Sequence, residues 1–108
     1  MRSRKLFMVA LACLLFVPAA AMAQSSIAGQ VTDNTGGVLP GVTVEASSPV
    51  LIGGARVVVT DGTGQYNVTN LLPGTYAVTF TLPGFGTQVR NELILAAGFA
   101  MDIDVAMS

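Results

Sequence analysis

The segment from Thr60 to Phe85, TDGTGQYNVTNLLPGTYAVTFTLPGF, constrains the fold more than any other part of the chain. Two clusters of turn-forming residues divide it, Asp61 to Gly64 and Leu72 to Gly74. After each cluster, apolar and polar side chains alternate with the period of two that a half-buried strand requires. Tyr66 and Tyr76 lead the apolar sets of these two strands. The segment therefore predicts consecutive antiparallel hairpins with both tyrosines facing the core.

The same alternation continues on both sides of this segment and predicts seven short strands in all. It groups Ile27, Gly29 and Val31 on one face of the first strand, and it places Val42, Val44 and Ala46 inward on the second and Asp102 and Asp104 outward on the last. The run Val57 to Val59 within them indicates burial on both faces or an irregular pleat. Ser48 to Ala55 lacks clean alternation and is expected to be a loop anchored by one apolar residue. The fold class predicted from the pattern is an all-β, seven-stranded antiparallel Greek-key sandwich. The predicted strands are Ile27 to Thr32, Gly41 to Ser47, Arg56 to Thr60, Gln65 to Thr69, Thr75 to Leu82, Gln88 to Leu95 and Phe99 to Met107.

The N-terminus has the features of a secretory signal peptide. Basic residues precede an apolar run from Leu6 to Val17, and Ala21 to Ala23 form a small-residue cleavage site. The run of about 12 residues fits a signal h-region and is short of the roughly 20 residues that span a bilayer. We expect a signal over residues 1–23, a mature domain over 24–108 and export by general secretion. The predicted destination is the periplasm, the outer membrane or the medium; the alternative is an uncleaved membrane anchor.

The mature region has few charges and no thiol. The single cysteine, Cys13, lies in the predicted signal, so no disulfide is expected in residues 24–108. Those residues carry two arginines and six carboxylates, a formal charge of −4. The chain therefore offers no electrostatic footprint for nucleic acid. We also expect no membrane span in the mature chain.

No residue pattern points to catalysis. The chain has no histidine, so an ordinary zinc site with histidine or cysteine ligands is not expected after residue 23. Asp102 and Asp104 have a spacing that overlaps some glycosidase pairs, but two acids on one strand do not flank a bond from opposite sides. Asp33 and Asp61 could supply oxygen to Ca²⁺, although turn formation already accounts for them. We predict no catalytic residue, no metal site and no cofactor.

Four segments together carry a resemblance to a known family. They are GQVTD from Gly29, GGVLPGVTVEASS from Gly36, TDGTGQY from Thr60 and LPGTYAVTFTLPGF from Leu72. In order and spacing they resemble a carboxypeptidase regulatory-like domain, a transthyretin-like sandwich also grouped with carbohydrate-binding-like folds. The copy at the N-terminus of TonB-dependent, Oar-like outer-membrane receptors is most similar. No plug or barrel sequence follows here, and Gly53 to Ala55 depart from the more polar connector expected in those receptors, so the resemblance does not extend to transport.

Two non-catalytic functions remain open. The first is a structural or protein-interaction module of the cell envelope, with an envelope protein or a receptor barrel as partner. The second is a carbohydrate-binding module with a polysaccharide ligand, which rests on fold analogy. Either would use exposed apolar side chains, unless these serve only as lids over the core. The candidate contact residues are Val50, Leu51, Ile52, Phe85 and Phe99.

Overall fold

The computed structural model describes residues 24–108. The predicted signal peptide, residues 1–23 with Cys13, lies outside the described residues. Within the described part, no helix is long and apolar enough to cross a membrane. The chain forms eight strands, which are β1 (Ser25–Asp33), β2 (Thr43–Ser47), β3 (Ala55–Val59), β4 (Gln65–Leu71), β5 (Gly74–Thr81), β6 (Gln88–Leu95), β7 (Ala100–Asp102) and β8 (Val105–Met107).

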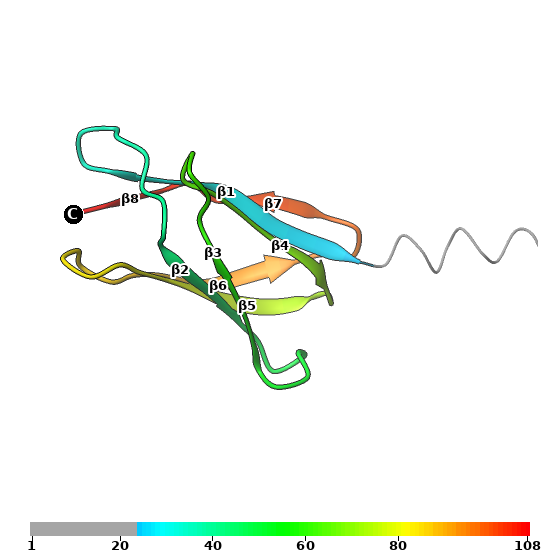
Figure 1. Cartoon of the computed structure of the whole chain (residues 1–108). Coiled ribbons are helices and arrows are strands. Elements are labelled where there is room, and N and C mark those ends of the chain that lie inside the picture. Colours follow the sequence, from blue (N-terminus) through cyan, green and yellow to red (C-terminus); the bar gives the residue numbers. More distant parts are fainter. Residues whose placement is uncertain (1–23) are drawn as a thin grey trace, which may run out of the picture.

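The strands form two layers, as Figure 1 shows, and the predicted sandwich is confirmed. Sheet I has the order β4-β1-β7, with β8 pairing farther along the same β1 strand. Sheet II has the order β3-β2-β5-β6 and is antiparallel throughout. The inner faces of the two sheets meet in a single hydrophobic core.

The core consists of the inward members of each alternating set. Both predicted inward tyrosines are buried, and Tyr66 of sheet I packs edge-on against Phe80 of sheet II with ring centroids 5.5 Å apart. The predicted inward faces of the first two strands are also confirmed, since Ile27 and Val44 are fully buried. The tyrosine hydroxyls find backbone partners. That of Tyr66 donates to the carbonyl of Ile103 at 2.6 Å, and that of Tyr76 to the carbonyl of Leu72 at 2.7 Å.

The hairpin prediction for Thr60 to Phe85 is wrong, although its turns are in the predicted places. β3 and β4 belong to different sheets, and so do β4 and β5. Each turn therefore arches the chain from one layer to the other across the core. A turn signal predicts that the chain reverses, but the reversed strand can pack against its predecessor through side chains as well as pair with it through backbone bonds.

The predicted last strand, Phe99 to Met107, is divided in two and runs parallel to β1, which departs from the all-antiparallel prediction. Gly29 explains the division. A Cβ at this position would collide with the backbone oxygen of Ile103, so the missing side chain makes room for that carbonyl inside the sandwich. The Ile103 amide donates to the carbonyl of Ala28 at 2.8 Å, and the Ile103 carbonyl accepts the Tyr66 hydroxyl from the core side. The outward Asp104 carboxylate accepts the Gln30 amide at 2.9 Å.

Neither alternative predicted for Val57 to Val59 is found, because β3 pairs with β2 without irregularity and is not buried on both faces. Val57 and Val59 are 58% and 59% exposed, and only Val58 packs against the core. The reason is that Val57 and Val59 lie on the outer face of sheet II, beside the exposed Thr43 and Glu45, and this face points away from sheet I. The loop before β3 follows the prediction, because Leu51 is the one apolar residue buried there.

Candidate functional site

Two rows of residues on the outer face of sheet II carry apolar and hydroxyl side chains, with Glu45 as their one carboxylate. The register places Val59, Thr43 and Thr81 in one row across the strands. The next row holds Val57, Glu45, Thr79 and Val89. We call these seven residues the valine–threonine face. All three of its valines are substantially exposed, and adjoining exposed apolar side chains such as Val57 and Val59 are typical of a contact surface.

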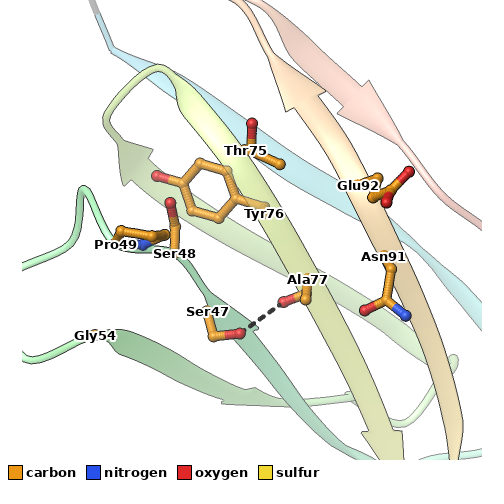
Figure 2. Close-up of a pocket in the computed structure, with 9 residues that line it drawn as sticks. All are labelled: Ser47, Ser48, Pro49, Gly54, Thr75, Tyr76, Ala77, Asn91 and Glu92. Atoms are coloured by element: carbon orange, nitrogen blue, oxygen red, sulfur yellow. Dashed lines mark hydrogen bonds between the residues drawn. The ribbon is translucent and has the colours of Figure 1, made fainter.

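A shallow groove of about 620 Å³ continues this face toward the loop between β2 and β3. Figure 2 shows Ser48 and Pro49 on one side of it and Asn91 and Glu92 on the other, with Ala77 between them. Small side chains, those of Ser47 and Ala77, line the bottom of the groove. The Ser47 hydroxyl donates to the Ala77 carbonyl at 3.3 Å. The remaining lining residues are Gly54, Thr75 and Tyr76.

An irregular pairing of β5 with β6 builds the far wall of the groove. Tyr76 pairs with Leu93 and Val78 with Arg90. Two residues of β6, Asn91 and Glu92, therefore lie opposite one residue of β5, Ala77. This is a β-bulge, which turns the side chains of the bulged strand away from the regular pleat. Glu92 has a φ of 57°, a left-handed conformation that side-chained residues adopt infrequently.

A second, polar groove of about 520 Å³ lies on the outer face of sheet I. Its floor is Ala28 and Gly29 of β1, and its polar groups stand in two rows. Asn67 and Asp102 lie on either side of Ala28, while Gln65 pairs with Gln30. The groove also includes Asp104. As predicted, both aspartates face solvent.

Two other acids, Asp33 and Asp61, form matching turns, which agrees with the structural interpretation of these residues. Each carboxylate accepts the hydroxyl of a threonine two residues later, Thr35 at 2.6 Å and Thr63 at 2.7 Å. Each also accepts two backbone amides. These bonds stabilise the charged form and lower the pKa of both carboxyls. Among the described residues, no three His, Cys, Asp or Glu gather where they could hold a metal ion.

The candidate contact residues do not form one surface. Val50, Leu51 and Ile52 lie in the loop after β2, and Phe99 precedes β7, all toward the end of the sandwich where β1 begins (Figure 1). Phe85 lies at the opposite end, next to the C-terminus, where Gly86 donates to the Ser108 carbonyl at 2.8 Å.

Burial also separates the candidate contact residues. Ile52 is fully exposed, whereas Leu51 is buried and Phe85 packs against the core as a lid. The valine–threonine face was not predicted as a site. The sequence signal for this face is the unbroken valine run in β3, because alternate residues of a strand in a two-layer sandwich must point away from the core.

Comparison with known proteins agrees with the architecture. The family model for the carboxypeptidase regulatory-like domain matches residues 26–108. A search of curated proteins found no match.

Three solved structures share the fold. The Bacillus anthracis TIE protein superposes with a TM-score of 0.66 at 19% identity over 79% of this chain and 16% of its own. A chain of a cohesin–X-dockerin complex from Acetivibrio cellulolyticus has a TM-score of 0.59 at 18% identity, over 77% of this chain and 56% of its own. A candidate carbohydrate-binding protein from Bacteroides uniformis has a TM-score of 0.59 at 19% identity, over 77% and 40%.

These likenesses concern the fold alone, because all three identities are low. The chain spans between 16% and 56% of the length of these structures. The family match covers both sheets and all eight strands apart from the first residue of β1. By this match, the chain belongs to the family of carboxypeptidase regulatory-like domains.

Proposed function

We propose that this domain is a non-catalytic protein-interaction module of the cell envelope that binds its partner through the outer face of sheet II. The observation that carries the proposal is the valine–threonine face, where Val57 and Val59 are each more than half exposed beside a single charge, Glu45. Burying such a surface requires little desolvation of charge and removes apolar area from water, at about 25 cal/mol per Å² before the costs of association.

The remaining surface chemistry supports binding over catalysis. The described residues contain no histidine and no cluster of metal ligands. Asp104, one of the two neighbouring aspartates, accepts a backbone amide, which is a structural use of its carboxylate. The proposed location, the periplasm or the outer membrane, follows from the N-terminal signal features and from the resemblance to the first domain of TonB-dependent receptors.

Site-specific photo-crosslinking in a Gram-negative cell that exports the chain tests this proposal. A photoreactive amino acid at Thr43 or Thr79 samples the valine–threonine face, and one at Asn67 samples the outer face of sheet I. We expect discrete protein adducts from the first two positions, lost when Val57→Lys is added, and none from Asn67. Equal labelling of both faces, or adducts that persist with Val57→Lys, would contradict the proposal.

Carbohydrate binding is the second candidate, and the polar groove of sheet I is the observation in its favour. Amide and carboxylate groups on a flat floor suit sugar hydroxyls, because each offers fixed donors or acceptors. Titration with common polysaccharides should then show saturable binding that weakens in Asn67→Ala and Asp102→Ala. The matched control is Thr43→Ala on the opposite face. A flat response across the polysaccharide panel would remove this candidate.

A further inference from the structure

β3 differs from the other strands at the edges of the two sheets. β4 and β6 each contain an irregularity in their pairing, and the opposite edge of sheet I is split into β7 and β8. β3 pairs with β2 over five consecutive positions without a shift. Bulges, breaks and charged side chains are the means by which proteins prevent edge strands from pairing with other chains. β3 has none of these irregularities, and the guanidinium of its one charged residue, Arg56, donates to the Thr69 carbonyl of β4 at 3.2 Å.

The backbone of β3 also has pairing groups that face outward. In an antiparallel pair, alternate residues direct their N–H and C=O groups toward the partner strand. The Thr60 amide bonds to Val42 at 3.0 Å, and the Gly54 carbonyl accepts from Ser48 at 3.0 Å, so the even-numbered positions face β2. The backbone groups of Val57 and Val59 therefore point away from the sheet, on the same residues whose side chains are exposed.

We propose that β3 pairs antiparallel with β3 of a second copy of this chain, about a two-fold axis at Val57. This inference goes beyond the proposed function, because edge pairing occupies the backbone of β3 and leaves the valine–threonine face open to another partner. The pairing would join two four-stranded sheets into one eight-stranded sheet and place both valine–threonine faces on the same side.

The chemistry of β3 suits a second copy. About the proposed axis, Val57 faces its own counterpart, Ala55 faces Val59, and Arg56 faces Val58. The valine pair is β-branched, which packs well across strands, and no two like charges stand opposite each other. The Glu45 carboxylates of the two copies are separated by both β3 strands, roughly 14 Å at about 4.8 Å per strand spacing, so they repel only weakly at physiological salt.

The interface is small, so the association is expected to be weak. Five residues per strand bury less than the roughly 1,200 Å² below which complexes are transient. We therefore expect the dimer to form as protein concentration rises through about 10 µM to 1 mM, the range of weak complexes.

Sedimentation of the full chain across this concentration range is the first test. Val57→Lys should shift the monomer–dimer midpoint at least about tenfold upward, because it places a charge at the two-fold axis. Ile94→Lys is the matched control, since Ile94 is 77% exposed on β6 at the other edge of sheet II, and it should leave the midpoint unchanged. A wild-type chain that remains monomeric at about 1 mM, or a dimer that Ile94→Lys disrupts and Val57→Lys does not, overturns the proposal.

Cysteine crosslinking in a Cys13→Ser background tests the register. Val57→Cys should form a disulfide dimer under mild oxidation, because residues opposite each other in an antiparallel pair lie within disulfide reach. Val59→Cys should crosslink with Ala55→Cys when the two variants are mixed, and Ile94→Cys should remain monomeric. Equal dimer yields from Val57→Cys and Ile94→Cys would overturn the register. Face-specific photo-crosslinks to a different protein, with a monomeric wild type, would retain the proposed function and reject self-pairing.

Discussion

The inner faces of the two sheets follow the same rule, whereas their outer faces diverge. Inside, alternating apolar residues from both sheets meet, as Tyr66 and Phe80 do. Outside, sheet I presents amides and carboxylates around Ala28, and sheet II presents valines and threonines. The outward positions are free to vary because they contribute little to the core. The fold therefore resides in one set of alternating positions and the proposed binding chemistry in the other.

The two sheets also differ in how closely backbone approaches backbone, and substitution of one glycine in each tests this difference. Gly29→Ala should destabilise the domain by about 2–4 kcal/mol, because the new Cβ collides with the Ile103 backbone and nothing rigid can yield cheaply. Gly74→Ala should cost less than about 1 kcal/mol, since its Cβ meets side-chain atoms alone, the Val50 methyls from 2.9 Å and the Ser48 hydroxyl at 3.6 Å. Denaturant unfolding measures both. Equal losses would show that the β7–β8 junction is not a rigid feature of sheet I.

The control Gly62→Ala shows whether a loss of stability, or of folding, in Gly29→Ala is specific to that site. A Cβ at Gly62 meets nothing within 4 Å, so that variant should be as stable as wild type within about 0.5 kcal/mol.

Each sheet contributes one tyrosine whose hydroxyl bonds a backbone carbonyl, and removing the two hydroxyls compares these bonds. Tyr66→Phe should cost about 1–2 kcal/mol, because it leaves the inward Ile103 carbonyl without its donor. Tyr76→Phe should cost about 1 kcal/mol or less, because the Leu72 residue at the rim is half exposed and water can replace the lost donor. The midpoints of urea unfolding report both values. A larger loss of stability for Tyr76→Phe would show that the hydrogen bond shielded from water is that of Tyr76 in sheet II and not that of Tyr66 in sheet I.

Alkaline pH should act on the same two tyrosines. Burial raises the pKa of both hydroxyls above the ordinary value of 10.0, and for Tyr66 the charges of Asp104 and Asp102 raise it further. The stabilisation is therefore complete below about pH 10 and falls as pH rises above it, because the unfolded state ionises first. Unfolding free energy measured from pH 8 to 11 should show this decline. Tyr66→Phe should flatten it more than Tyr76→Phe does, and an unchanged slope in Tyr66→Phe would contradict the account.

The smallest effects are expected at the two aspartate turns that join the sheets. The pKa of Asp33 and of Asp61 is lowered from 3.8 by the threonine hydroxyl and by backbone amides. The stabilisation they provide is therefore present above about pH 4 and is lost as pH falls below it. Asp33→Asn and Asp61→Asn should each reduce the acid sensitivity of the thermal midpoint slightly and by similar amounts. A large difference between the two variants would show that the turns are not equivalent.

Much of the architecture could be predicted from the residues because alternation reports burial directly. Val42, Val44 and Ala46 were predicted to face inward and are fully buried. The strand partners could not be predicted in the same way. The turn at Asp61 to Gly64 specifies a reversal, and whether β4 then pairs with β3 or crosses to sheet I depends on contacts distant in sequence.

The candidate site was less predictable than the core. Val57 lies in an apolar run that is typical of a buried strand, and its exposure follows only from its place on the outer face of sheet II. Phe85 was predicted to be either a contact residue or a lid over the core, and it packs on the core at the end of the sandwich where Gly86 bonds to Ser108. Glu92 carries no local signal for a left-handed conformation. It lies in the bulge between two stretches of β5–β6 pairing whose registers differ by one residue, one that ends at Tyr76 with Leu93 and one that begins at Val78 with Arg90.

The sequence by itself determined the all-β class, the inward faces, most of the turns and the family, because each depends on residues close together in the chain. Only the tertiary structure decided which strands pair, where the C-terminal strand breaks and which valines remain exposed. The physical reason is that these features depend on contacts between residues distant in the chain. The space left by the missing side chain of Gly29, for example, is filled by the backbone oxygen of Ile103. β3 likewise lies at an edge only because the order of sheet II is β3-β2-β5-β6, and this order is set by pairing between strands that are distant in the sequence.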